Sequence, residues 1–174
     1  NNKIGMVPED RKQLGLVLKH NVQDNLTVVK LKDLPWLLKS DREEAQITDH
    51  YINALSIATR GGQQIVGRLS GGNQQKVFLA RWLNTDAEIL LLDNPTQGID
   101  VGAKAEIYKL ILELAKQGKT ILINTLEIPE IQKVADYCAV FYNGEIIKVL
   151  EHQEIDEMTV MMYSTNAAQA EEGK

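Results

Sequence analysis

The sequence lacks multiple cysteines, long apolar runs and an excess of basic residues, features that several classes of protein require. Its 174 residues include one cysteine, Cys138, which excludes a disulfide framework and a cysteine-rich zinc site. The longest unbroken apolar run, residues 137–142, is too short to cross a bilayer. Nineteen Lys and Arg residues against 24 Asp and Glu residues give a net charge of −5. Because the chain has no basic excess, we expect no nucleic-acid partner.

The sequence begins Asn1-Asn2-Lys3, without an initiator methionine, and we expect no signal or transit peptide. We therefore expect a cytoplasmic protein, cut from something longer. The length suits one domain or a compact pair of subdomains.

The second half of the sequence alternates strand and helix patterns. Residues 88–93 and 120–123 are short apolar runs, which predict strands buried on both faces. Apolar residues recur between them at helical spacing, and Gly118 should end that helix. The face of this helix consists of Ile107, Leu110, Ile111 and Leu114. Such alternation predicts an α/β fold with a parallel sheet.

Other segments carry local signals of the same kind. Asn143-Gly144 separates two strand-like runs and predicts a hairpin. Residues 4–7 resemble a short strand. The four residues from Ser40 to Glu43 form a capping box, which predicts a helix over residues 44–56. Another helix should follow Gly71 and Gly72.

Residues 69–76, Leu-Ser-Gly-Gly-Asn-Gln-Gln-Lys, are the strongest functional signal. A Ser-Gly-Gly turn that feeds a helix leaves backbone N–H groups free, and the helix dipole favours an anion there. Two glycines also let the backbone approach a phosphate closely. Taken alone, Ser-Gly-Gly is equally typical of an ordinary loop and helix cap.

The longer string resembles the signature motif of ATP-binding cassette (ABC) ATPases, in the form found in importers of simple sugars. Further segments resemble the same family in the same order. Residues 89–93 resemble its Walker B strand and 95–100 the stretch leading into its D-loop, while 7–12 and 127–131 resemble the second cassette of tandem sugar importers. The resemblance covers residues 5–150.

This resemblance implies a P-loop NTPase core with a parallel sheet and an inserted helical subdomain. Residues 1–9 would be a strand and Q-loop remnant of the core, and residues 10–69 the helical subdomain. Residues 70–163 would complete the core with the signature helix, Walker B strand, D-loop and switch region. Residues 164–174 are small and polar, and we expect a disordered tail.

The resemblance also assigns residues to ATP and Mg²⁺. Asp93, at the end of the Walker B strand, would hold the metal. The nucleotide-binding positions are Ser70, Gly71, Gly72, Asn73, Gln74, Glu9 and Asp100.

Three positions depart from the pattern of an active cassette. Asn94 stands where the family has a catalytic Glu, and an amide cannot accept a proton from water as a carboxylate can. Leu126 stands at the position of the switch histidine. Glu9 occupies the Q-loop glutamine position, where its oxygens remain suited to magnesium. We therefore expect this cassette's own site to be degenerate.

No Gly-x-x-x-x-Gly-Lys-Ser/Thr string occurs in the sequence, although that loop holds the β- and γ-phosphates of ATP. By the family order the P-loop and the antiparallel strands around it would precede Asn1. The sequence is therefore interpreted as the part of a cassette from the Q-loop onward. We expect that this chain alone does not hydrolyse ATP.

The resemblance implies part of the ATP-binding subunit of a simple-sugar importer, peripheral on the inner face of the cell membrane. Its signature motif would complete an ATP site on a first cassette in the same chain. Permease subunits, and indirectly a sugar-binding protein, would be the other partners. Two alternatives stay open, namely an inactive regulatory cassette and an ABC ATPase outside transport.

Overall fold

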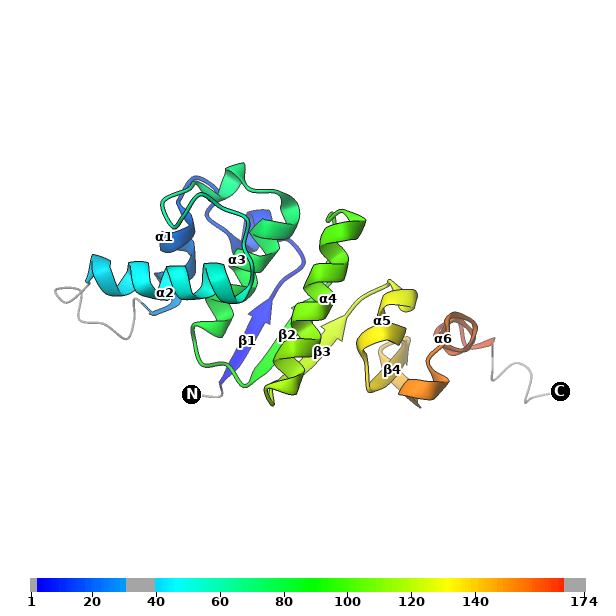
Figure 1. The fold of residues 1–174 in the computed structure, drawn as a ribbon. Coiled ribbons are helices and arrows are strands. Elements are labelled where there is room, and N and C mark those ends of the chain that lie inside the picture. Colours follow the sequence, from blue (N-terminus) through cyan, green and yellow to red (C-terminus); the bar gives the residue numbers. More distant parts are fainter. Residues whose placement is uncertain (1–2, 31–39, 168–174) are drawn as a thin grey trace. The chain divides into compact units, whose positions relative to one another are not determined.

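The computed structural model describes residues 3–30 and 40–167. The chain divides into two compact units, Asn1–Asn124 and Thr125–Lys174, whose elements are labelled in Figure 1. Within the described ranges, no helix combines the length and the apolar character that a membrane span needs. The subdomain boundaries expected at residues 9, 69 and 163 remain predictions.

The first unit is built on a three-stranded parallel sheet. Its strands are β1 (Ile4–Val7), β2 (Ile89–Asp93) and β3 (Thr120–Asn124), in the order β1-β2-β3. Leu92 of β2 pairs with Val7 on one side and with Ile123 on the other. The parallel sheet and the positions of all three strands confirm the predicted α/β fold.

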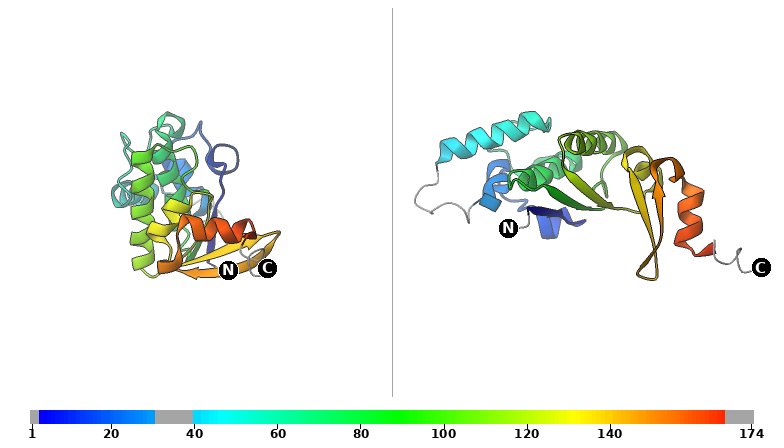
Figure 2. Two further views of the ribbon diagram at one scale, coloured as in Figure 1. Left: turned by 90° about the vertical axis from the view of Figure 1, so that its right-hand side faces the viewer. Right: turned by 90° about the horizontal axis from the view of Figure 1, so that it is seen from below.

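Two helices, α3 (Gly71–Leu83) and α4 (Val101–Lys116), cover one face of this sheet (Figure 2). Leu90 and Leu92 of β2 are buried on that face, with exposed fractions of 0% and 2%. The expectation that residues 120–123 are buried on both faces is wrong, because Leu122 is 52% exposed. In this chain β3 is an edge strand of the three-stranded sheet, and its residues are half-buried or exposed.

Helix α4 follows its predicted pattern. Asp100 caps its first turn, and the face formed by Ile107, Leu110, Ile111 and Leu114 is buried. The helix ends at Lys116, and Gly118 then takes a φ of 89°, which a glycine adopts at little cost.

The remaining helices of the first unit lie between β1 and β2 in the sequence. They are α1 (Val22–Thr27) and α2 (Asp41–Ala54), with short turns at η1 (Arg11–Gly15), η2 (Val28–Lys30) and η4 (Val66–Arg68). The Ser40 hydroxyl accepts a hydrogen bond from the Glu43 N–H, as the capping box predicts. The helix begins three residues earlier than expected, because the acidic residues after Ser40 already lie in its first turn.

A buried arginine joins α3 to the segment around α1. Arg81 Nε donates to the Asn25 carbonyl over 2.7 Å, and Nη2 donates to Asn25 Oδ1 over 2.8 Å. Nη1 donates to the Gly15 carbonyl. Burial lowers the pKa of Arg81 to about 10, so the guanidinium stays charged at neutral pH. Helix α3 is therefore held in place by three hydrogen bonds from one side chain.

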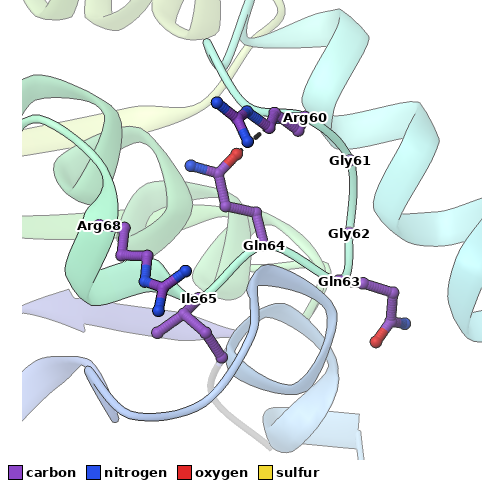
Figure 3. Close-up of a pocket in the computed structure, with 7 residues that line it drawn as sticks. All are labelled: Arg60, Gly61, Gly62, Gln63, Gln64, Ile65 and Arg68. Atoms are coloured by element: carbon purple, nitrogen blue, oxygen red, sulfur yellow. Dashed lines mark hydrogen bonds between the residues drawn. The ribbon is translucent and has the colours of Figure 1, made fainter.

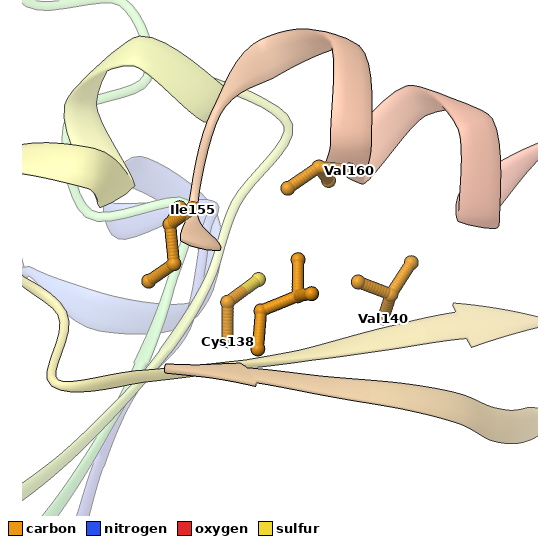
Figure 4. Close-up of a cluster of buried hydrophobic side chains, with 5 residues drawn as sticks. Cys138, Val140, Ile155 and Val160 are labelled. Carbon is orange, nitrogen blue, oxygen red and sulfur yellow. The ribbon is translucent and has the colours of Figure 1, made fainter. Parts of the chain in front are cut away.

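The second unit packs helices on a two-stranded antiparallel sheet. Its elements are α5 (Ile128–Val134), β4 (Tyr137–Tyr142), β5 (Glu145–Glu151), η5 (His152–Glu154) and α6 (Glu157–Ser164). Asn143 and Gly144 form the predicted hairpin turn, with φ values of 49° and 85°. The buried cluster consists of Cys138, Val140, Leu150, Ile155 and Val160 (Figure 4).

Part of the expected disordered tail at residues 164–174 is described. Ser164 ends α6, and a turn follows at Thr165 and Asn166. Residues 168–174 lie outside the described residues.

Candidate functional site

The signature segment forms the start of helix α3. Ser70 is the N-cap residue, and its hydroxyl oxygen accepts from the Asn73 N–H over 3.4 Å and from Asn73 Nδ2 over 2.9 Å. Gly71 and Gly72 supply the first amides of the helix, and within the described residues neither amide has an acceptor. Free N–H groups at the positive end of a 13-residue helix form a site suited to an anion.

Gly72 has a packing role that the sequence did not indicate. It is buried against α4, where a Cβ added to it would lie 2.5 Å from the Cβ of Ala103. Because that distance is far inside van der Waals contact, only glycine lets the two helix starts approach this closely. The geometry of the signature turn therefore depends on the contact between α3 and α4.

The side chains of Asn73 and Gln74 hold the loop that precedes α3. Asn73 Oδ1 accepts from the Ala58 N–H over 2.7 Å. Buried Gln74 donates through Nε2 to the carbonyls of Val66 and Leu69, over 3.3 and 3.1 Å. Both side chains thus fix the approach to Ser70 from within the chain.

Asp100 lies at the same junction of helices. As the N-cap of α4 it accepts from the Ala103 N–H over 2.9 Å, and Ala103 is the residue that meets Gly72. The structure therefore places Asp100 close to the signature turn.

A second group of polar side chains gathers where β2 and β3 end. Asp93 Oδ1 accepts from Asn124 Nδ2 over 2.8 Å. Asn94 Nδ2 donates to Glu9 Oε1 over 2.9 Å, and the Asn94 N–H donates to the Asn124 carbonyl over 2.8 Å. The carboxyl edge of a parallel sheet is the usual place for a ligand. The structure thus brings together Glu9, Asp93 and Asn94.

The sequence reasoning missed Asn124. It is the last residue of β3 and pairs with Asp93 of β2. The sequence signal that could have identified it is a polar residue at the end of a strand that lies parallel to β2. Its amide donates to Asp93 Oδ1, and this contact restricts the orientation of the carboxylate.

The oxygens at this edge are of the type that magnesium prefers, but the described residues contain no group of three or more Asp, Glu, His or Cys side chains that could hold a metal ion. Asp93 and Glu9 offer carboxylate oxygens, the hard donors that Mg²⁺ prefers in proteins. Both side chains are partly exposed and therefore accessible to a ligand. Each is also hydrogen-bonded to an amide, Asp93 to Asn124 and Glu9 to Asn94.

Asn94 adopts a backbone conformation that favours its own residue type. Its φ is 41°, in the left-handed region where Asn is enriched and most other non-glycine residues are strained. The turn that follows β2 is closed by a hydrogen bond from the Gln97 N–H to the Asn94 carbonyl, over 3.0 Å.

Leu126, at the expected switch position, belongs to the second unit. It lies just before α5, and its side chain is 88% exposed. Beside it the Thr125 hydroxyl accepts from the Glu127 N–H over 3.0 Å. An aliphatic side chain offers no hydrogen bond to a phosphate, so Leu126 cannot replace a histidine at this position.

Comparison with known proteins yields matches of three kinds. The family model described as "ABC transporter" matches residues 1–97, more than half of the chain. The ribose import ATP-binding protein RbsA of Shouchella clausii (strain KSM-K16) is 43% identical over 166 residues, which cover 94% of this chain and 33% of that protein. The arabinose import ATP-binding protein AraG of Escherichia coli O6:H1 is 43% identical over 154 residues, with 87% and 31% covered.

Solved structures share the fold. A dimeric ATP-binding cassette in a post-hydrolysis state, bound to ADP and Pi, superposes with a TM-score of 0.72 at 22% identity. The match covers 87% of this chain and 63% of that chain. The chain spans about a third of the length of the curated relatives it matches.

Proposed function

Because the chain belongs to the ABC transporter family, we propose that it is part of an ATP-binding subunit that powers the import of a simple sugar. Two relatives with 43% identity are named as ribose and arabinose import ATP-binding proteins. The sugar-importer form of residues 7–12 and 69–76 supports the same substrate class.

The start of α3 is the observation that carries this proposal. Ser70 would bind the γ-phosphate of an ATP held on the P-loop of a partner cassette. The amides of Gly71 and Gly72 would donate to the same phosphate, because the described residues offer them no acceptor. Donors fixed in advance toward developing charge stabilise the transition state of phosphoryl transfer.

This cassette's own site would bind a nucleotide and turn it over poorly. Asp93 and Glu9 would hold Mg²⁺, which neutralises phosphate charge when bound. Asn94 can orient a water by hydrogen bonding but cannot accept its proton. Its amide is already hydrogen-bonded to Glu9. The ATP site that Ser70 completes on the partner cassette would therefore contribute more to turnover than the site that contains Asp93 and Asn94.

The partners follow from this arrangement. A first cassette in the same chain would supply the P-loop opposite Ser70. Permease subunits would contact the helical part around α1 and α2, and a sugar-binding protein would act indirectly through the permease. The complex would place this chain peripherally on the inner face of the cell membrane.

Ser70→Ala in the full-length protein, assembled with its permease, tests the proposal. We expect steady-state ATP turnover to fall about tenfold or more, since one transition-state donor is lost. Ser40→Ala is the matched control, because Ser40 also caps a helix over a 3.4 Å hydrogen bond. Equal turnover in the two variants would show that Ser70 acts only as a helix cap.

The 174-residue chain by itself provides a second test. Because its sequence contains no Gly-x-x-x-x-Gly-Lys-Ser/Thr string, we expect no tight, magnesium-dependent ATP binding in equilibrium measurements with a fluorescent ATP analogue. Submicromolar binding would contradict the view that a partner must supply the phosphate-binding loop.

Asn94 also favours a second candidate function, a regulatory cassette that assembles with an ATPase and does not hydrolyse ATP itself. The two functions differ in the effect of Ser70→Ala. If the chain only regulates, the variant should leave maximal ATP turnover of the complex unchanged and alter its response to transported sugar.

A further inference from the structure

A hollow of about 610 Å³ lies beside the loop that connects α2 to α3. Figure 3 shows the residues around it, and they come from a single stretch of the loop. They are Arg60, Gly61, Gly62, Gln63, Gln64, Ile65 and Arg68. None of the hydrogen bonds described above for Ser70 or Asp93 includes these residues, and the lining of the hollow ends at Arg68, two positions before Ser70.

The loop around the hollow is tied by its own hydrogen bonds. Gln64 Oε1 accepts from the Arg60 N–H over 2.6 Å and lies 3.0 Å from the Thr59 hydroxyl. The Gln64 N–H donates to the Gly61 carbonyl over 3.1 Å. These contacts close a turn whose shape is set before any ligand arrives.

The loop is also fixed to helix α1. The Val22 N–H donates to the Gln64 carbonyl, and the Gln23 N–H donates to the Gly62 carbonyl, each over 2.9 Å. The loop backbone is therefore ordered before a ligand binds, and the remaining ordering cost falls on the exposed side chains.

The hydrogen bond from Arg60 decides which way the Gln64 amide faces. Only the amide oxygen can accept from a backbone N–H, so Nε2 must take the other position. In Figure 3 this nitrogen points between the side chains of Arg60 and Arg68. The hollow is thus bordered by three side chains that present hydrogen-bond donors.

The two guanidinium groups carry uncompensated charge. No Asp or Glu lines the hollow, and within the described parts of the chain neither Arg60 nor Arg68 forms an ion pair. The chain as a whole has a net charge of −5, so two free cations on one short loop make a local site for an anion. Both side chains are exposed and accessible.

We propose that this hollow binds the phosphate group of a small organic phosphate. A phosphate monoester has three terminal oxygens for the three donor side chains, whereas a carboxylate has two. Planar guanidinium forks match phosphate geometry. The volume of about 610 Å³ lies within the range of small-molecule sites and exceeds the needs of phosphate alone. Gly61 leaves room for the organic part on one wall, because a Cβ added there would meet no atom within 4 Å.

Titration of the isotope-labelled chain with inorganic phosphate, followed by NMR, tests this proposal. We expect saturable shifts of the amides at residues 60–68, with a Kd of about 1 mM. Arg60→Gln and Arg68→Gln should each weaken binding about tenfold, since each removes a charge-assisted contact. Arg42→Gln, an exposed position on α2, should leave the affinity unchanged. Circular dichroism shows whether each variant remains folded.

Four results would overturn the proposal. One is the absence of saturable shifts up to about 10 mM phosphate, ten times the expected Kd. Another is unchanged affinity in the Arg60→Gln, Arg68→Gln double variant. Equal binding of acetate at matched ionic strength would indicate a general anion surface. Shifts confined to Gly71 and Gly72 would instead place phosphate at the start of α3.

Discussion

Replacing Gly72 by alanine is the most direct perturbation of the signature turn. The new Cβ would lie 2.5 Å from the Cβ of Ala103, whereas carbon atoms in contact prefer about 3.5 to 4.0 Å. Helix α3 must therefore move away from α4 by roughly 1 Å or more. Overpacking of this size costs about 1 to 3 kcal/mol in unfolding free energy. The displaced helix also carries Ser70, so ATP turnover of the assembled protein should fall as well.

Urea unfolding of a double-mutant cycle measures this cost. Ala103→Gly removes the atom that the new Cβ would meet, and alone it should cost about 0.5 to 1 kcal/mol through helix propensity. In combination with Gly72→Ala it should recover most of the loss, giving a coupling energy of at least about 1 kcal/mol. Strictly additive free energies would refute the reasoning, because they would mean that Gly72 and Ala103 are not in contact.

Three further predictions concern other residues. Arg81→Met should lower the unfolding free energy in urea by about 3 kcal/mol, because it strands the buried acceptors of Asn25 and Gly15; a loss no larger than that of exposed Arg42→Met would contradict this. Hydrogen bonds from the Thr159 side chain and backbone lower the pKa of Asp156 below 3.8. Its contribution to stability is thus present above that pH and is lost as the pH falls through the depressed pKa. Asp156→Asn keeps the helix cap and should flatten the fall in Tm between about pH 5 and pH 2; parallel Tm curves would argue against it. In the full-length protein, Asn94→Glu alone would place a second carboxylate beside Glu9. Glu9→Gln removes that repulsion and keeps an amide oxygen for Mg²⁺, so the Glu9→Gln, Asn94→Glu pair should raise ATP turnover more than Asn94→Glu alone. The reverse order would exclude an acid–amide pair at this position.

Much of the fold was predictable because its signals are local. Ser40 caps a helix through a side-chain contact that spans three residues, and Asn143-Gly144 turns a hairpin within two residues. The face of α4 follows from a spacing of three and four residues. Such features depend on backbone geometry and neighbouring side chains, which the sequence specifies directly.

The exposure of β3 was not predictable in the same way. Its residues are as apolar as those of β2, yet Leu122 is half exposed while Leu90 and Leu92 are buried. An apolar run shows that a strand can be buried. Whether it is buried depends on which helices pack over each face and on the order of strands in the sheet.

The sequence by itself determined the family, the order of its motifs and the residue types at each site position, including the amide at Asn94 and the aliphatic side chain at Leu126. Only the tertiary structure decided what those residues touch. It paired Asn94 with Glu9 across 85 positions, set Gly72 against Ala103, and fixed the Gln64 amide between two arginines. The physical reason is that hydrogen bonds and van der Waals contacts act over a few ångströms in space, and distance along the chain does not reveal which residues come that close.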